Sequence, residues 1–206
     1  MRVYLAGPDV FLPDPHGRGA TLKGICARHG LAGVFPLDEP PDVPSHWTGL
    51  PLAQRIALCN EAHIQRSAAL IANLTPFRGP SADAGTVFEL GYMRALGRPV
   101  FGWSNAAADF TTRTVSFLAG AARPCASGWR DQEGLAIEVF GCADNLMIDG
   151  AIIASGGSLF TAEVPAAERW TNLAAFERCV AAAAALLLTR PAAVVRPLRR
   201  RRVAAR

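Results

Sequence analysis

The sequence lacks the patterns that mark several common classes of protein. No G-x-G-x-x-G follows the first apolar segment, no Walker A sequence occurs, and no serine lies in a G-x-S-x-G turn. The four histidines show no ligand spacing, and the five cysteines (26, 59, 125, 142 and 179) form no Cys-x-x-Cys pair. We therefore expect no metal site, no disulfide framework, no cofactor held by a glycine-rich loop and no serine-hydrolase site.

Long apolar runs are also missing. The first ten residues lack the apolar stretch of a signal peptide. The longest apolar run, residues 179–188, is shorter than the roughly 20 residues that a membrane-spanning helix needs. We expect a cytoplasmic protein with reduced cysteines and no membrane partner.

An excess of positive charge occurs only at the C-terminal end. The 206 residues carry a net charge of +4, but seven arginines lie between positions 190 and 206. Without them the chain is near neutral or slightly acidic, so no specific nucleic-acid partner is expected. The length and the 50% hydrophobic content predict a single domain over residues 1–190, followed by a basic, disordered tail at 191–206.

Short apolar segments alternate with helical ones over the first hundred residues. Strands are predicted at 2–6, 31–36, 68–74 and 99–102, and helices at 20–29, at 51–66 and around Glu89. Further along, the pattern predicts an irregular stretch at 104–131 with a short helix at 112–121, a helix at 132–141, a short apolar segment at 145–148 and a long helix at 165–188. This alternation predicts an α/β fold in which helices cover both faces of a parallel sheet.

The most informative stretch is DAGTVFELGYMRALGRPV, residues 83–100. Glu89 lies in the first turns of a predicted helix, where a carboxylate is expected to stay ionised, as suits a nucleophile or a ligand for a cationic centre. Asp83 and Glu89 are six residues apart and can face one pocket at the carboxyl edge of the sheet. Two carboxylates in different environments suit cleavage of a glycosidic bond.

Other candidate residues belong to the same edge of the sheet. Tyr4 lies within the first predicted strand, and the residues just beyond that strand or after the third are Gly7, Pro8, Phe11, Asn73, Phe77, Arg78 and Gly79. Simpler interpretations stay open for the candidates: Asp83 as a helix N-cap, Glu89 as a surface residue, Tyr4 as core, Arg78 as a solvated loop residue, Asn145 as a turn residue and Met147 as a core filler.

Three segments together resemble the nucleoside 2-deoxyribosyltransferase family. They are YLAGPDVF (4–11), IANLTPFRGPSADAGTVFELGYMRALGRPV (71–100) and DNLMI (144–148), in the family's order. The resemblance implies a flavodoxin-like or Rossmann-like three-layer sandwich with a central, mainly parallel sheet. It also implies nucleosides and nucleobases as substrates, no cofactor, and homo-oligomers assembled from dimers.

The resemblance also implies residue roles. Glu89 matches a nucleophile that forms a covalent deoxyribosyl-enzyme, Asp83 an acid that contacts substrate, and Tyr4 a tyrosine that orients the nucleophile. Asn145 and Met147 match residues that a neighbouring subunit lends to the site. Substrate binding is expected at Gly7, Phe11, Asn60, Phe77, Arg78, Gly79, Asn145 and Met147, with Phe11, Phe77 and Trp47 sandwiching a flat base and Arg78 reaching it.

The sequence departs from the family pattern at Asn60, where some members carry an aspartate that protonates the leaving base. An amide cannot donate that proton, so Asp83 or water would do so. The predicted reaction is a retaining double displacement that exchanges bases on 2′-deoxyribose. Two alternatives stay open: an N-glycoside hydrolase that acts on nucleosides or nucleoside monophosphates with water as acceptor, and a nucleotide-sensing module, which the two carboxylates disfavour. The similarity to the nucleotide phosphoribohydrolase motif PGGxGTxxE is weak, because Ala82, Asp83 and Ala84 stand in place of its Pro-Gly-Gly.

Overall fold

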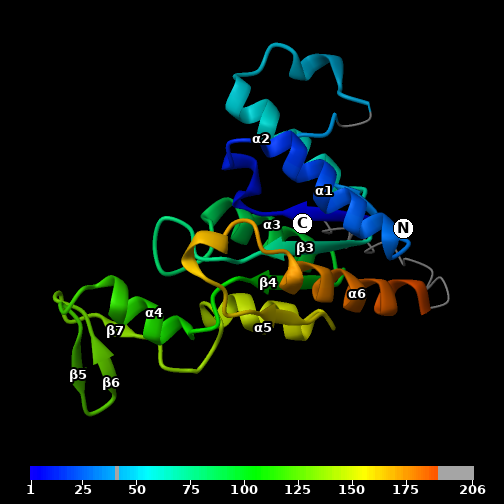
Figure 1. Cartoon of the computed structure of the whole chain (residues 1–206). Coiled ribbons are helices and arrows are strands. Elements are labelled where there is room, and N and C mark those ends of the chain that lie inside the picture. The colour runs from blue at the N-terminus through cyan, green and yellow to red at the C-terminus, as the bar shows by residue number, and fades with distance from the viewer. Residues whose placement is uncertain (40–41, 190–206) are drawn as a thin grey trace, which may run out of the picture.

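A five-stranded parallel sheet forms the centre of the molecule (Figure 1). The computed structural model describes residues 1–39 and 42–189. The strands are β1 (Arg2–Ala6), β2 (Ala32–Val34), β3 (Ala69–Asn73), β4 (Val100–Ser104) and β8 (Leu159–Thr161), in the order β2-β1-β3-β4-β8. Every neighbouring pair is parallel. This is the flavodoxin-like strand order, so the predicted α/β sandwich is confirmed.

Helices cover both faces of the sheet. α1 (Pro15–Arg28) and α6 (Ala174–Thr189) pack on one face, while α2 (Leu52–Gln65), α3 (Ala84–Ala95) and α5 (Leu146–Ala154) pack on the other. Because side chains alternate along a strand, Val3 and Leu5 of β1 enter the first core, and Tyr4 and Ala6 enter the second. Tyr4 is therefore directed to the same face of the sheet as α3.

The turn after β1 is fixed by close backbone packing and a buried ion pair. A side chain at Gly7 would place its Cβ 2.7 Å from the Cβ of Asn73, so only glycine fits there. Asp9, in the 3-10 turn Pro8–Phe11, accepts hydrogen bonds from Asn73 Nδ2 at 2.8 Å and from Arg18 Nε at 2.7 Å. These contacts lock the first loop against the end of β3, at the carboxyl edge of the sheet.

The predicted helix at 132–141 is wrong, because that segment holds only the short strand β7 (Ala136–Ile137). The stretch at 104–131, predicted to be irregular apart from a short helix, contains β5 (Arg123–Cys125) and β6 (Gly128–Arg130). The three strands form a small antiparallel sheet that projects from the body beside α4 (Phe110–Phe117) (Figure 1). Gly128 and Gly134 have φ angles of +124° and +83°, which permit the tight turns. The Asp131 carboxylate also accepts from the backbone N–H groups of Glu133 and Leu135, and this closes the second turn.

Three helix starts differ from the sequence-based expectation, and one strand was missed. The segment at 145–148 opens α5, because the Asn145 side chain caps that helix by accepting from Met147 N at 3.0 Å. α1 begins at Pro15 rather than at residue 20, with Asp14 as its N-cap. α6 begins only at Ala174, after a 3-10 turn at Ala166–Glu168, and the edge strand β8 was not predicted.

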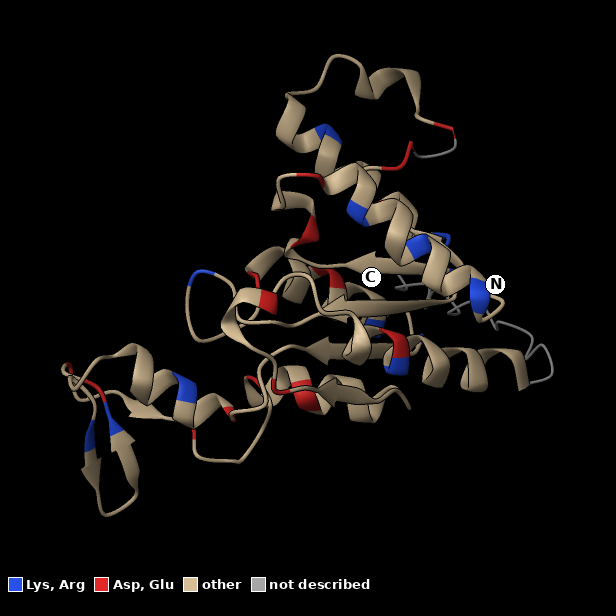
Figure 2. Ribbon diagram, in the orientation of Figure 1, with Lys and Arg blue, Asp and Glu red and all other residues tan. Residues whose placement is uncertain are grey.

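The charged residues of the described body are distributed over several elements. Figure 2 shows basic residues spaced along α1 and on the β5–β6 hairpin.

All five cysteines are free. Within residues 1–39 and 42–189, no helix has the length and apolar character that crossing a membrane requires. The predicted tail at 191–206 lies outside the described residues.

Candidate active site

Glu89 lies in a cleft of about 330 Å³ at the carboxyl edge of the sheet. The second turn of α3 carries Glu89, and the loop after β1 and helix α2 supply the other walls. The cleft is lined by Gly7, Val10, Phe11, Pro36, Leu37, Ile56, Asn60, Asp83, Gly85, Thr86 and Glu89. The structure therefore brings five of the predicted site residues, Gly7, Phe11, Asn60, Asp83 and Glu89, to one place.

Two donors hold one oxygen of the Glu89 carboxylate. The Tyr4 hydroxyl donates to Glu89 Oε1 at 2.7 Å, and Asn60 Nδ2 donates to the same oxygen at 3.3 Å. Tyr4 is fully buried in β1. It is thus a core residue, as the simpler interpretation had it, and its polar end reaches Glu89.

The pKa of Glu89 is raised from its ordinary value of 4.5 to about 7. Burial is the largest cause, because it disfavours the charged carboxylate, and the negative charge of Asp83 adds to it. The hydrogen bonds from Tyr4 and Asn60 oppose the rise. The sequence analysis expected the helix terminus to favour ionisation of Glu89, whereas burial in the folded protein opposes it and raises the pKa. Burial and the neighbouring Glu89 also raise the pKa of Tyr4, which keeps its hydroxyl protonated as a donor.

Asp83 has two structural roles. Its carboxylate caps α3 by accepting from the backbone N–H of Thr86 at 3.0 Å and from the Thr86 hydroxyl at 3.1 Å. The same side chain lines the Glu89 cleft. The cap fixes the position of this charge relative to Glu89, so the two interpretations of Asp83 are compatible.

The predicted sandwich of a base between Phe11 and Phe77 is wrong. The two rings stack on each other with centroids 5.3 Å apart and planes 12° apart, and only Phe11 lines the cleft. Arg78 has a φ of +56° and places its guanidinium 4.5 Å from the centre of the Phe77 ring. Trp47 lines an adjoining pocket of about 350 Å³, which shares Asn60 with the cleft. Gly79 lines a separate pocket beside Arg113.

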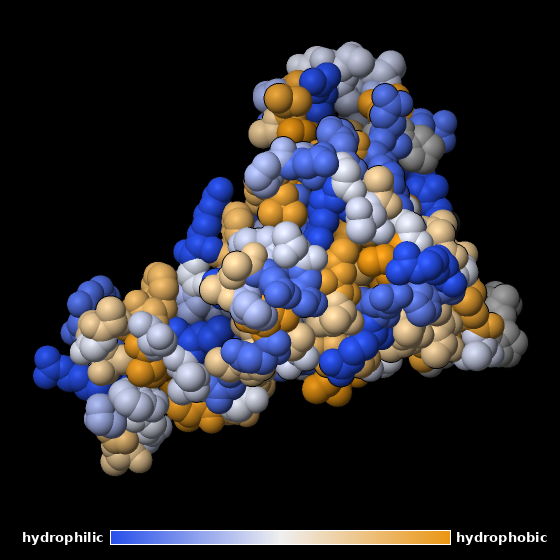
Figure 3. Space-filling view, in the orientation of Figure 1, coloured by the Kyte–Doolittle hydropathy of each residue, from blue (hydrophilic) through white to orange (hydrophobic). Residues whose placement is uncertain are grey.

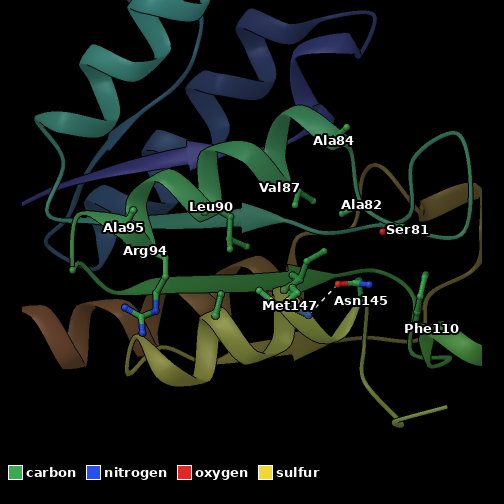
Figure 4. A pocket seen from close by; sticks show the side chains of 14 residues that line it. Ser81, Ala82, Ala84, Val87, Leu90, Arg94, Ala95, Phe110, Asn145 and Met147 are labelled. Carbon is green, nitrogen blue, oxygen red and sulfur yellow. Dashed lines mark hydrogen bonds between the residues drawn. The ribbon is translucent and has the colours of Figure 1, made fainter. Parts of the chain in front are cut away.

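Asn145 and Met147 lie on the other side of α3 from the Glu89 cleft. Together with α3 they line a surface depression of about 870 Å³ between α3 and α5, which we name the α3–α5 groove. Figure 4 shows Val87 and Leu90 pointing from α3 into this groove, opposite Met147. Met147 is 71% exposed. Within one chain, the structure does not bring these two residues into the Glu89 cleft.

Sequence reasoning missed several residues that shape the site. Asp9 is buried, and its carboxylate links Asn73 to Arg18; its signal was its place just after the first strand, within the Gly7–Phe11 turn. Thr86 also lines the cleft. Its signal in the sequence was its position three residues before Glu89, which places both residues on one face of the helix. Within the described residues, no cluster of three or more potential metal ligands occurs.

The fold and the cleft define a class: a flavodoxin-like α/β protein with two carboxylates in a cleft at the carboxyl edge of its sheet. A family model described as nucleoside 2-deoxyribosyltransferase matches residues 3–147. The chain therefore belongs to the nucleoside 2-deoxyribosyltransferase family, as the sequence motifs predicted, and by family it is an enzyme that acts on nucleosides.

Two individual proteins are similar to this chain. An uncharacterized protein of Schizosaccharomyces pombe is 32% identical over 165 residues, which are 75% of this chain and 78% of the relative. Among solved structures, a 2-deoxyribosyltransferase from Leishmania mexicana superposes with a TM-score of 0.52 at 26% identity, covering 71% of this chain and 84% of that one.

Proposed function

We propose that this protein is a nucleoside 2-deoxyribosyltransferase that moves 2′-deoxyribose from one nucleobase to another. The observation that carries the proposal is the Glu89 carboxylate, held at 2.7 Å by the Tyr4 hydroxyl in a cleft that Asp83 also lines. Family membership and the similarity to the Leishmania mexicana 2-deoxyribosyltransferase support the same conclusion.

The proposed chemistry is a double displacement. A Glu89 oxygen attacks C1′, the bond from C1′ to the base nitrogen breaks, and the base leaves with its electron pair and takes up a proton. A second base then attacks C1′ through a nitrogen, gives up its own proton, and releases the Glu89 carboxylate. Two inversions at C1′ retain the configuration. Absence of the electron-withdrawing 2′-hydroxyl eases the oxocarbenium-like transition state.

The hydrogen bonds indicate which oxygen attacks. In the described part of the chain, Tyr4 and Asn60 both donate to Oε1 of Glu89. We assign the nucleophilic role to Oε2 and an orienting role to the two donors. Because burial and Asp83 raise the pKa of Glu89 to about 7, its carboxylate is more basic than an exposed one and is a correspondingly stronger nucleophile.

Proton transfer to the leaving base falls to Asp83 in its protonated form or to water. Asn60 contacts Glu89 through its amide nitrogen, and an amide has no proton to donate as an acid. Asp83 lines the same cleft, so its carboxyl group lies on the substrate's side of α3. One face of the base is assigned to the Phe11 ring, because Phe11 lines the cleft and Phe77 lies behind it.

We further propose that the active unit is a dimer. Asn145 and Met147 line the α3–α5 groove rather than the cleft of their own chain, and Met147 is largely exposed. The exposed position suits residues that reach into the Glu89 cleft of a neighbouring subunit. Figure 3 shows hydrophobic atoms at the surface along the lower edge, where α5 lies in Figure 1.

The test is chromatography of the purified protein with deoxyinosine as donor, with and without adenine. The proposal predicts deoxyadenosine when adenine is present and little free hypoxanthine when it is absent. Hypoxanthine released at equal rates in both reactions would identify a hydrolase, in which water resolves the same intermediate. Pyrimidine deoxynucleosides and monophosphates are tested in parallel, and failure of all donors to react would contradict the proposal.

A further inference from the structure

A buried network lies between the loop that carries Asp83 and the start of α5. Asp144 is its centre, with a side chain only 2% exposed. The Asp144 carboxylate accepts hydrogen bonds from the Ser81 hydroxyl and from the backbone N–H of Ala82 at 3.0 Å. It also accepts from the backbone N–H of Asn145 at 2.8 Å. One carboxylate therefore holds the residue before Asp83 and the residue that caps α5.

Arg113 of α4 ties the same two segments from the other side. Its side chain is 9% exposed, and its Nη2 lies 3.4 Å from Asp144 Oδ2. Arg113 Nε donates to Pro80 O at 2.8 Å, and Nη2 donates to Ala143 O at 2.7 Å. A single guanidinium thus bridges the two loops, and its planar set of donors suits this geometry.

We propose that Asp144 and Arg113 are positioning residues, which hold Asp83 in the Glu89 cleft and Asn145 at the mouth of the α3–α5 groove. This inference rests on the proposed function for the meaning of the two positions. Neither residue touches the cleft itself. Their effect passes through the backbone of Ala82 to Asp83, and through the backbone of Asn145 to the start of α5. In a dimer, each Asp144 would set one acid of its own cleft and one residue of the partner's cleft.

A purely structural ion pair is the competing explanation, and the charge on Asp83 separates the two. The titratable groups that face Glu89 are Tyr4 from β1 and Asp83 at the start of α3; α2 presents the uncharged Asn60. The charge of Asp83 raises the pKa of Glu89. If Asp144 positions Asp83, loosening Asp144 moves that charge and lowers the pKa of Glu89, whereas a general loss of stability does not.

The experiment is an NMR titration of Glu89 in full-length protein labelled with carboxyl-¹³C glutamate. Glu89→Gln assigns the signal, and Asp83→Asn, which keeps a capping side chain, sets the shift expected on loss of the charge. Asp144→Asn is expected to move the titration midpoint in the same direction, by at least half of that shift. Ser155→Ala is the matched control, because the Ser155 hydroxyl bonds to Ile152 O and accepts from Val100 N at the far end of α5.

The outcomes separate clearly. A folded Asp144→Asn protein whose Glu89 titrates as in the wild type would overturn the proposal. If that variant does not fold, Ser81→Ala, which removes one hydrogen bond to Asp144, replaces it. A smaller shift in the same direction is then expected, and an unchanged midpoint overturns the proposal.

Kinetics add a second readout. Asp144→Asn is expected to lower kcat/KM by about 10- to 100-fold, because small displacements of reacting groups carry costs of that size. Ser155→Ala should stay within about threefold of the wild type at a temperature where both remain folded. A wild-type protein that turns over no nucleoside would refute the proposed function, yet the NMR titration would still report whether Asp144 positions Asp83.

Discussion

The two sides of α3 differ sharply in chemistry. One side presents Glu89 and Thr86 to a small cleft with hydrogen-bonding partners, while the other presents Val87 and Leu90 to the larger α3–α5 groove. In the cleft, burial raises the pKa of a carboxyl group that has two donors. In the groove, the exposed Met147 faces an apolar wall. In the proposed dimer, the cleft on one side of α3 binds the substrate. The groove on the other side carries Asn145 and Met147, which reach the cleft of the neighbouring subunit.

The largest effect is expected on the cleft side. Glu89→Ala should lower kcat/KM by about a thousandfold or more while leaving the fold intact, because no covalent intermediate can form. Initial rates of base exchange measure it, with circular dichroism to check the fold. Glu133→Ala, at an exposed glutamate on the projecting small sheet, is the matched control and should leave the rate unchanged. Turnover of Glu89→Ala within about tenfold of the wild type would exclude Glu89 as the nucleophile.

Mixed oligomers test whether the groove side serves another subunit. Asn145→Ala alone should lower the rate by about 100-fold, comparable to loss of a site-forming contact in other enzymes. Co-expression with Glu89→Ala should restore about a quarter of the wild-type rate, because half of randomly formed dimers would then contain one complete site of two. The measurement is the specific activity of the tagged and purified mixture. A mixture no more active than the mean of its parents would show that the two sides of α3 do not cooperate across subunits.

Tyr4→Phe removes a hydrogen bond from Glu89, the proposed nucleophile, without changing the packing of the ring. Since that bond lowers the pKa of Glu89, its loss should raise the pKa and move the acidic limb of the kcat/KM profile to higher pH. At about pH 7 the rate should fall roughly tenfold or more, as for loss of a hydrogen bond to a charged group. Much of the loss should be recovered at higher pH, and an unmoved limb would contradict the orienting role of Tyr4.

The smallest effect concerns stability. The pKa of Glu89 is raised on folding from 4.5 to about 7, so the folded state binds more protons than the unfolded state between these values. The free energy of unfolding therefore falls as pH rises through this range. Glu89→Gln carries no ionisable group and should raise Tm by on the order of 10 °C at pH 8 but not near pH 4. Thermal denaturation at the two pH values measures this, with Glu133→Gln as control, and an equal change in Tm at both would refute it.

The sequence predicted the part of the fold that local patterns determine. The strands at β1, β3 and β4 are short runs of apolar residues that end at glycine, proline or polar residues, and each lies where the sequence predicts a strand. Local patterns failed for β8 and for the β5–β7 sheet. These strands are only two or three residues long. The pairing of β5, β6 and β7 depends on turns at Gly128 and Gly134, and β8 pairs in parallel with the distant β4.

The site was predictable where its residues share one strand end or one helix face. Tyr4, Asp83 and Glu89 meet because β1 and α3 are adjacent on one face of the sheet, which the alternation of strands and helices implies. The raised pKa of Glu89 was not predictable, because it depends on how deeply the three-dimensional packing buries the carboxyl group. The contact between Phe11 and Phe77 depends likewise on loop conformation, including the positive φ of Arg78.

The central claim is that Glu89 carries the sugar during the reaction. A donor nucleoside with fluorine at C2′ slows breakdown of the intermediate, because the electron-withdrawing substituent destabilises the oxocarbenium-like transition state. Mass spectrometry of the protein after incubation with such a donor, followed by peptide mapping, tests the claim directly. We expect a mass gain of one fluorinated deoxyribosyl group on the peptide that contains Glu89, absent from Glu89→Gln and discharged by added adenine. Release of base with no adduct on that peptide, or an adduct on another residue, would contradict the account.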